Sequence, residues 1–219
     1  MRLNKFIGET GLCSRREADE LIAAGRVTLD GAVAVAGAKW AEGMAVCVDG
    51  KELKRKPAAK NRRRHVYIAL NKPVGITCTT DTADVSNIID FIDHQERIFP
   101  IGRLDKDSEG LILLTSNGDI VNRILRAENN HEKEYLVGVN KPVTAEFLRT
   151  MARGVHIHRQ LTKPCKVSKL AKYGFRITLT QGLNRQIRLM SEALGYKVVQ
   201  LRRVRIINVK LGTLKPGAW

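Results

Sequence analysis

The sequence has few aromatic residues and no long apolar segment. Phe, Trp and Tyr make up 5% of its 219 residues, so extensive base stacking on a single strand is not the expected binding mode. No apolar run approaches the roughly 20 residues that a membrane helix requires, and the N-terminus lacks the apolar segment of a secretory signal. With 43% apolar residues, the chain is expected to be a globular cytoplasmic protein without membrane attachment.

Cysteine and histidine are sparse and scattered. No two cysteines have CxxC spacing, which argues against a zinc site and against a disulfide framework. The five histidines are equally dispersed, and no spacing of carboxylates or cysteines completes a set of ligands. The sequence therefore predicts reduced thiols and no bound metal. The cysteines are Cys13, Cys47, Cys78 and Cys165.

Acidic residues are scarce relative to basic ones. Twenty-two Asp and Glu against 38 Lys and Arg give a net charge of +16, which usually means a polyanionic partner such as nucleic acid. Residues 1–53 carry seven basic and eight acidic side chains, whereas residues 54–64 carry seven basic and none acidic. Residues 65–219 carry 24 basic against 14 acidic side chains. The middle segment and the C-terminal part therefore dominate the electrostatic field.

The N-terminal quarter of the chain has the pattern of two short helices followed by short hairpins. A helical apolar pattern starts at Leu3 and stops at Gly11. A capping box from Ser14 to Glu17 opens a second helix that is expected to run to Gly25. Two Asp-Gly turns then separate short apolar strands. These patterns predict a small module of helices and hairpins.

A basic segment follows this module. Residues 54–64, KRKPAAKNRRR, have no apolar periodicity and hold seven positive charges, which is typical of a linker between domains. The linker can also contact phosphates without sequence preference. We therefore place a first domain at residues 1–53 and a second at residues 65–219.

The second domain is organised around residues 101–119, IGRLDKDSEGLILLTSNGD. The apolar run from Leu111 to Leu114 fits a strand buried on both faces. The polar turn before it carries Asp105, Asp107 and Glu109, and a rigid strand can fix the side chains of such a turn for chemistry. Asp and Gly are also ordinary turn formers, so residue types alone leave catalysis and simple turn formation both open.

The elements around this turn alternate irregularly between strand and helix. Without regular beta-alpha-beta units, an α+β domain around a largely antiparallel sheet fits best. The last helix places Arg185 and Arg188 three residues apart on one face. Strands are expected at 66–70, 135–139, 175–180, 198–201 and 204–211, and helices at 87–93, 144–151 and 185–194.

The N-terminal segment LNKFIGETGLCSRREADELIAAGRVTLDG resembles the alpha-L RNA-binding module, first known from a small-subunit ribosomal protein. In that family the two helices present basic residues to RNA. The resemblance implies that Arg2, Lys5, Arg15 and Arg16 bind RNA. The alternative is that these are ordinary solvated helix charges, because the module is nearly neutral overall.

Four further segments, in this order, resemble the RsuA branch of the ribosomal RNA pseudouridine synthases. The resemblance implies a synthase domain that isomerises uridine to pseudouridine in structured RNA, with large-subunit ribosomal RNA the expected substrate. It also implies a monomer that needs no cofactor or metal. The segments are ALNKPVG at 69–75, GRLDKDSEGLILLTSNGD at 102–119, EKEYLV at 132–137 and QGLNRQIRLM at 181–190.

The resemblance assigns catalytic roles to three residues. Asp105 matches the essential carboxylate, which acts as a nucleophile on the base or the sugar or assists formation of a glycal; the sequence leaves these routes open. Arg188 matches the arginine that pairs with this carboxylate, although a surface phosphate contact is the alternative. Tyr135 matches the tyrosine that packs on the target base, whereas by sequence alone it would be an ordinary strand aromatic.

The resemblance also implies RNA contacts around this centre. Arg103 matches a residue that fills the gap left by a flipped uridine. Lys72 matches a motif whose role is structural as much as RNA-contacting, and both Lys72 and Arg185 are expected to contact RNA. The branch commonly has Arg where this chain has Leu189, which removes a possible phosphate contact. Relatives usually continue beyond a Gly-x-Trp segment, often with a basic tail, whereas this sequence stops at Trp219.

Two other functions compete with this interpretation. A non-catalytic ribosome-assembly factor would use the same basic surfaces without needing Asp105, Tyr135 and Arg188 together. A glycoside hydrolase would use Asp105 and Asp107 as its carboxylate pair, but such pairs normally come from different elements, and the strong positive charge argues against it.

Overall fold

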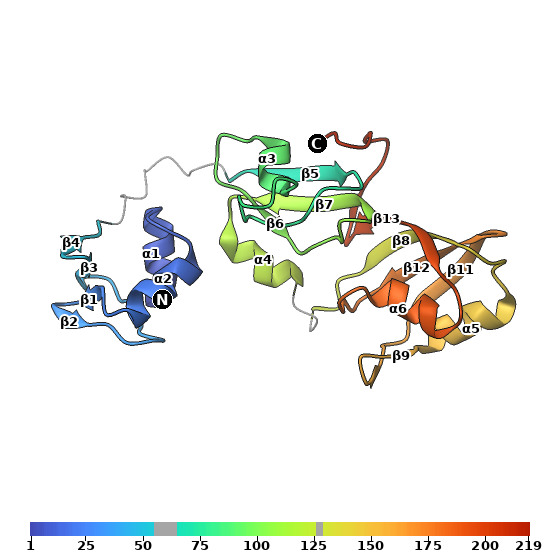
Figure 1. Ribbon diagram of the computed structural model, residues 1–219, viewed down its shortest axis with the longest axis horizontal. Coiled ribbons are helices and arrows are strands. Elements are labelled where there is room, and N and C mark those ends of the chain that lie inside the picture. The colour runs from blue at the N-terminus through green and yellow to red at the C-terminus, as the bar shows by residue number, and fades with distance from the viewer. Residues whose placement is uncertain (55–64, 126–128) are drawn as a thin grey trace. The chain divides into compact units, whose positions relative to one another are not determined.

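The computed structural model describes residues 1–54, 65–125 and 129–219 (Figure 1). The chain divides into two compact units, Met1–Arg64 and His65–Trp219. The predicted basic linker, residues 54–64, lies outside the described residues except for Lys54.

The N-terminal unit packs two helices with a small sheet. Its buried core consists of apolar side chains from both helices and from the strands, with Phe6 stacked on Trp40 at 4.4 Å between ring centroids. The sheet has the order β2-β1-β3-β4, and every pairing in it is antiparallel. The elements are α1 (Leu3–Thr10), α2 (Arg15–Ala23), β1 (Val27–Leu29), β2 (Ala32–Val33), β3 (Val46–Val48) and β4 (Lys51–Glu52).

The ends of these two helices follow from their capping residues. Gly11 adopts the left-handed conformation that closes α1. The Ser14 side chain accepts a hydrogen bond from the Glu17 amide at 3.2 Å, and the Ser14 amide donates to the Glu17 carboxylate at 2.6 Å. This reciprocal capping box confirms the predicted start of α2. The helix ends at Ala23, so the predicted end at Gly25 was two residues too late.

The C-terminal unit is built on one large mixed sheet. Its strand order is β11-β12-β8-β13-β7-β5, with β6 paired to β7 and β14 paired to β13. Among the described strand pairs of this sheet only β13–β7 is parallel, which confirms the predicted α+β class and largely antiparallel sheet. The strands are β5 (Tyr67–Lys72), β6 (Phe99–Ile101), β7 (Glu109–Thr115), β8 (Lys133–Val139), β11 (Lys166–Ala171), β12 (Gly174–Leu179), β13 (Val198–Ile206) and β14 (Val209–Lys210).

The structure differs from the sequence predictions in one strand boundary and in strands that were not predicted. The expected strands at 198–201 and 204–211 form the single strand β13 followed by the short β14, because the ladder continues through charged residues that break the apolar pattern. The exposed strand β11 was missed, since it has almost no buried positions. A separate hairpin of β9 (His156–Ile157) and β10 (Gln160–Leu161) was also missed.

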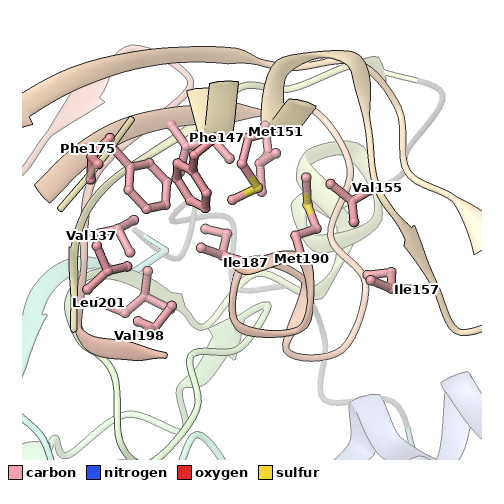
Figure 2. Packing of buried hydrophobic residues seen from close by; sticks show 14 residues of the cluster. Val137, Phe147, Met151, Val155, Ile157, Phe175, Ile187, Met190, Val198 and Leu201 are labelled. Atoms are coloured by element: carbon pink, nitrogen blue, oxygen red, sulfur yellow. The ribbon is translucent and has the colours of Figure 1, made fainter. Parts of the chain in front are cut away.

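Helices pack against this sheet and complete its core. In Figure 2, Phe147 and Met151 of one helix and Ile187 and Met190 of another lie in one cluster, which continues through Phe147 to Phe175 of β12. These side chains are almost completely buried, so the second of these helices is held rigidly on the sheet. The helices of the unit are α3 (Ile88–Ile92), α4 (Gly118–Leu125), α5 (Ala145–Arg153) and α6 (Gln186–Ala193).

Strand β7 lies between β5 and β13 in the sheet. Leu111 packs with Ile206 of β13 in one cluster, whereas Ile112 packs with Leu70 of β5 in another. The predicted strand buried on both faces is therefore confirmed.

Gly110 permits the parallel contact between β7 and β13. It pairs with Arg203 and has a φ of +107°, a conformation that other residues rarely adopt. A Cβ atom at this position would overlap the carbonyl oxygen of Arg203 and lie 2.6 Å from its backbone nitrogen. A glycine is therefore required where the two strands approach.

We predict that Gly110→Ala lowers the free energy of unfolding by more than about 2 kcal/mol, because it adds backbone strain to a steric overlap between two strands. Gly182→Ala is the control, since a Cβ there meets nothing within 4 Å. Urea denaturation followed by circular dichroism measures both variants. Equal stability of the two would contradict the close approach.

Candidate active site

The acidic turn between β6 and β7 is tied to the rest of the domain by backbone contacts. The Ser108 amide donates to the Asp105 carbonyl at 3.0 Å and closes the turn. The Gly75 amide donates to the Lys106 carbonyl at 2.8 Å, which joins the turn to the loop after β5. Strand β7 begins at once after the turn, so the Asp105 carboxylate projects from a fixed backbone.

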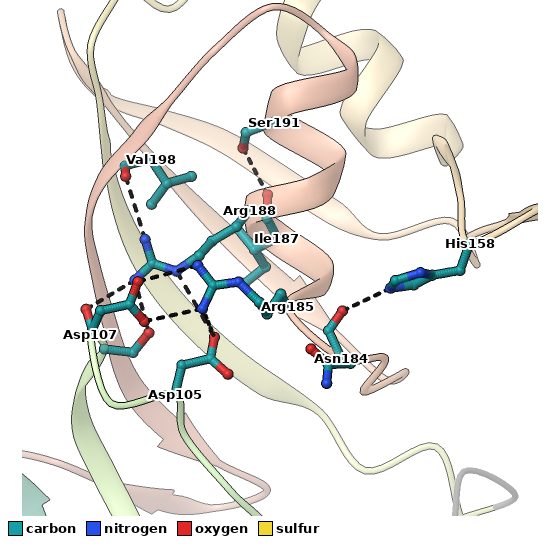
Figure 3. A network of polar contacts seen from close by, with 10 residues as sticks. Asp105, Asp107, His158, Asn184, Arg185, Ile187, Arg188, Ser191 and Val198 are labelled. Carbon is teal, nitrogen blue, oxygen red and sulfur yellow. Dashed lines mark hydrogen bonds and ion pairs between the residues drawn. The ribbon is translucent and has the colours of Figure 1, made fainter. Parts of the chain in front are cut away.

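Two arginines at the start of α6 face this turn. Figure 3 shows the side chains of Arg185 and Arg188 converging on Asp105 and Asp107. Arg185 contacts Asp105 at 3.5 Å and donates to both carboxylate oxygens of Asp107 at 3.4 and 3.3 Å. Arg188 lies 3.9 Å from Asp105 and 3.3 Å from Asp107, measured between charged atoms. The predicted pairing of Arg188 with Asp105 is thus present as a long ion pair.

The Arg188 side chain is held in place on several sides. It is 12% exposed, and its guanidinium donates to the Asp107 carbonyl and the Ser108 hydroxyl, both at 3.0 Å, and to the Val198 carbonyl at 3.4 Å. Its buried Nε is the atom nearest Asp105 and has no hydrogen-bond partner. One donor of a fixed guanidinium is therefore available to the Asp105 carboxylate, and such contacts commonly shorten when substrate binds.

Asp107 acts as the common partner of the two arginines. Partial burial by itself would raise the pKa of Asp107, but the hydrogen bond from Arg185 and the charges of Arg188 and Arg185 outweigh it, so the pKa lies below its ordinary value. The same hydrogen bond raises the pKa of Arg185. The pairing keeps Asp107 ionised and orients both guanidinium groups, which is a structural role.

Tyr135 lies on β8 next to β13 and is half-buried. Its ring packs against two apolar clusters, the one that contains Phe175 and the one that contains Ile112. Its direct neighbour across the strands is Arg203, whose guanidinium carbon lies 6.0 Å from the centre of the ring. Arg203 is 3% exposed and was not singled out by the sequence, because no motif or spacing marks it.

The expected RNA contact of Lys72 is wrong for this structure. The Lys72 side chain is fully buried, and its ammonium donates to the carbonyls of Pro73 and Ile76, both at 2.8 Å. Burial lowers the pKa of Lys72. Lys72 therefore stabilises the loop after β5 through these two hydrogen bonds. The side chain of Arg103, the other candidate for an RNA contact near Asp105, is exposed.

The missed hairpin β9–β10 supports the loop that leads to the two arginines. His158, in the turn of the hairpin, lies with its Nε2 3.2 Å from the Asn184 carbonyl (Figure 3). The Lys163 amide donates to the Gln181 side chain at 3.0 Å. These two contacts hold residues 181–184 in place immediately before Arg185. Arg185 itself adopts the left-handed backbone conformation, with a φ of +50°.

The four basic candidates of the N-terminal unit stand at the starts of its two helices. Arg2 precedes α1, and Lys5 lies in its first turn, 3.6 Å from Glu9. Arg15 and Arg16 open α2 and are exposed, as is Arg2. These positions leave the arginines accessible to a ligand.

None of the four cysteines forms a disulfide bond in this structure. Burial raises the pKa of Cys165 to about 11, so this thiol is protonated at neutral pH. Within residues 1–54, 65–125 and 129–219, no group of three His, Cys, Asp or Glu is arranged to hold a metal ion. No helix in the same part of the chain is long and apolar enough to cross a membrane.

Comparison with known proteins identifies the class to which this site belongs. Residues 66–193 match the RNA pseudouridylate synthase family, and residues 1–39 match the S4 domain. A crystal structure of a pseudouridylate synthase superposes with a TM-score of 0.70 at 32% identity, over 99% of this chain and 94% of that one. The chain therefore belongs to the RNA pseudouridine synthase family and carries an S4 module.

Two relatives show where it falls within the family. It is 55% identical to the dual-specificity RNA pseudouridine synthase RluF of Escherichia coli, over all of this chain and 74% of that protein. It is 35% identical to the ribosomal small subunit pseudouridine synthase A of Salmonella typhimurium, over all of this chain and 95% of that protein. The resemblance to the RsuA branch, and within it to RluF, is thereby confirmed.

We predict a defined pH dependence for Asp107→Asn. Because the folded-state pKa of Asp107 is lowered, its ionised form stabilises the native state above about pH 4, and this contribution is lost as the pH falls through the folded-state pKa. The stability lost in the Asn variant should therefore be larger at neutral pH than at about pH 3.5, as measured by urea denaturation.

The control for this measurement is Glu96→Gln, a change at an exposed carboxyl before β6. The stability difference between parent and control should be nearly the same at the two pH values. A constant difference for Asp107→Asn as well would mean that its ion pairs do not stabilise the fold.

Proposed function

We propose that this chain isomerises uridine to pseudouridine at specific positions of structured RNA in the large ribosomal subunit, with Asp105 as the catalytic carboxylate. The observation that carries the proposal is the Asp105 carboxylate on a fixed turn, facing Arg185 at 3.5 Å and Arg188 at 3.9 Å. Two guanidinium groups beside a carboxylate orient it through charge-assisted contacts, and a carboxylate held in this way can act as a nucleophile.

The reaction explains why one carboxylate is sufficient. The bond between ribose and the ring nitrogen breaks, the uracil turns, and a ring carbon forms the new bond. That carbon loses its proton and the released nitrogen gains one, so no redox change or phosphoryl transfer occurs. Asp105 either adds to the base or the sugar, or assists formation of a glycal. In each route its partner Arg188 orients the carboxylate, and Tyr135 offers an aromatic surface to the uracil. No step in this scheme requires a metal or a cofactor.

The glycosidic bond is accessible only after the uridine leaves the base stack. Arg103 precedes Asp105 by two residues, and its side chain is exposed, so it is placed to occupy the gap left by a flipped nucleotide. Arg185 is 45% exposed and can exchange part of its contact with Asp107 for a phosphate.

Binding of a large structured RNA is supported by the charge and by the N-terminal module. The net charge is +16, and Arg2, Lys5, Arg15 and Arg16 lie at the starts of the two helices of the S4 module. We extend this module to residues 1–53 and assign residues 54–64 as a basic linker. Leu189 packs against the core of the synthase domain. A leucine at this position, where the branch commonly has an arginine, therefore affects packing more than phosphate contacts.

The two competing functions fit less well. A glycoside hydrolase would need two separately controlled carboxylates, whereas Asp105 and Asp107 come from one turn and share the same two arginines. An assembly factor would have no need of the Asp105–Arg188 pair. The family assignment favours the isomerase over both.

We predict that Asp105→Asn abolishes isomerisation and leaves RNA affinity nearly unchanged. The amide keeps the shape of the side chain but lacks the negative charge and the nucleophilic oxygen. Single-turnover assays on ribosomal RNA, with isomer mapping of the product, measure the rate, and filter binding measures affinity. Residual turnover within about tenfold of the parent would remove Asp105 from the chemistry.

We predict that Arg188→Lys slows the single-turnover rate at saturating RNA by about 30-fold or more, which corresponds to about 2 kcal/mol of transition-state stabilisation. Lysine keeps one positive charge but cannot make the several directed contacts of the guanidinium. Arg149→Lys, at an exposed position on α5, is the control. A normal rate with weakened affinity and a reduced salt dependence would make Arg188 a phosphate contact instead.

A further inference from the structure

Arg203 is a buried cation in the centre of the sheet. Its side chain is 3% exposed, and among the described residues no carboxylate lies within ion-pair distance of it. Burial of an uncompensated guanidinium is costly, and one of its nitrogens, Nη2, is buried without a hydrogen-bond partner. Packing alone would be served better by an apolar residue, so the position of the charge requires an explanation.

The contacts of Arg203 connect the parts of the proposed active site. Its Nε donates to the Leu111 carbonyl of β7 at 2.7 Å, and its Nη1 donates to the Arg103 carbonyl at 3.4 Å. Arg103 lies two residues before Asp105, so the second bond holds the acidic turn from its beginning. The first bond ties the same guanidinium to the strand that follows the turn.

The other partner of Arg203 is the ring of Tyr135. The two residues are direct neighbours across the antiparallel β8–β13 pair, so their side chains share one face of the sheet. The guanidinium carbon lies 6.0 Å from the ring centre, within the range of a cation–π contact. Register shifts in β13 between Arg203 and Arg205 mark an irregularity at this point of the ladder, a feature often found beside active sites.

The backbone of Arg203 fixes the same region. It forms the parallel pair with Gly110, at the junction of the acidic turn and β7. The backbone of one residue therefore limits the position of the turn, while its side chain limits the position of Tyr135 and Arg103. Its charge also adds to burial in lowering the pKa of Lys133.

We propose that Arg203 is a positioning residue for pseudouridine formation, which sets the Asp105 turn and the Tyr135 ring at a fixed separation so that a uracil fits between carboxylate and ring. The proposal rests on the proposed function, since it assigns those two residues to catalysis. Arg203 itself acts through Arg103, Leu111 and Tyr135 and touches no substrate atom.

The test is Arg203→Lys in the full chain, with Arg202→Lys as the matched control. The lysine variant keeps the charge, but a single ammonium cannot bridge the carbonyls of Arg103 and Leu111 and face the ring at the same time. Arg202 is the preceding residue of β13, is only partly buried, and lines a shallow groove with Leu136 away from these contacts.

The expected result is a single-turnover rate at saturating RNA at least about tenfold below the parent, with RNA affinity within about threefold. Amide hydrogen exchange should rise in residues 103–108, while exchange in the N-terminal unit stays the same. The Arg202→Lys control should match the parent in rate and exchange. A purely structural role would lower the melting temperature without changing the rate at a temperature where the variant is folded.

Two outcomes would overturn the proposal. One is a rate for Arg203→Lys within about twofold of the parent. The other is loss of cooperative unfolding in both Arg203→Lys and Arg203→Gln, which would make Arg203 a core residue only. Asp105→Asn in the same assay separates this proposal from the proposed function. An inactive Asp105→Asn beside a fully active Arg203→Lys would reject the positioning role alone, whereas an active Asp105→Asn would reject the assigned chemistry.

Discussion

The parallel pairing of β7 with β13 is the constraint on which the synthase domain depends. It joins two parts of the chain more than 90 residues apart at Gly110 and Arg203, where the backbones approach so closely that only glycine fits. On one side of this pair β7 fixes the turn that carries Asp105. On the other side β13 pairs with β8, which carries Tyr135. The positions of both candidate catalytic residues therefore follow from one strand contact.

Helix α6 is the second rigid support of the site. Ile187 and Met190 bury one face of this helix in the core, and Arg188, between them in sequence, projects toward the acidic turn. Asp107 then holds both arginines of the helix, so that Asp105 meets oriented donors. Apolar packing sets the direction of the arginines, and the electrostatic contacts refine it.

Much of this organisation was predictable because it is local. The capping box at Ser14 and the apolar run from Leu111 are decided by residues within a few positions, and both were predicted correctly. The proximity of Asp105 and Arg188 came from the family resemblance, since spacing does not show contacts over more than 80 residues. An RNA contact was expected for Lys72 from the family resemblance, but its side chain is fully buried. Its burial depends on carbonyls of the loop that folds over it, which no periodicity reveals.

The distance in sequence between Gly110 and Arg203 has a consequence for synthesis of the chain. A nascent polypeptide that has not yet reached β13 contains the acidic turn and Tyr135 but lacks the strand that joins them. It also lacks the two donors of Arg203 that hold the turn. The acidic turn and Tyr135 are therefore fixed relative to each other only after β13 has left the ribosome, and a nascent copy that stops before β13 lacks this arrangement.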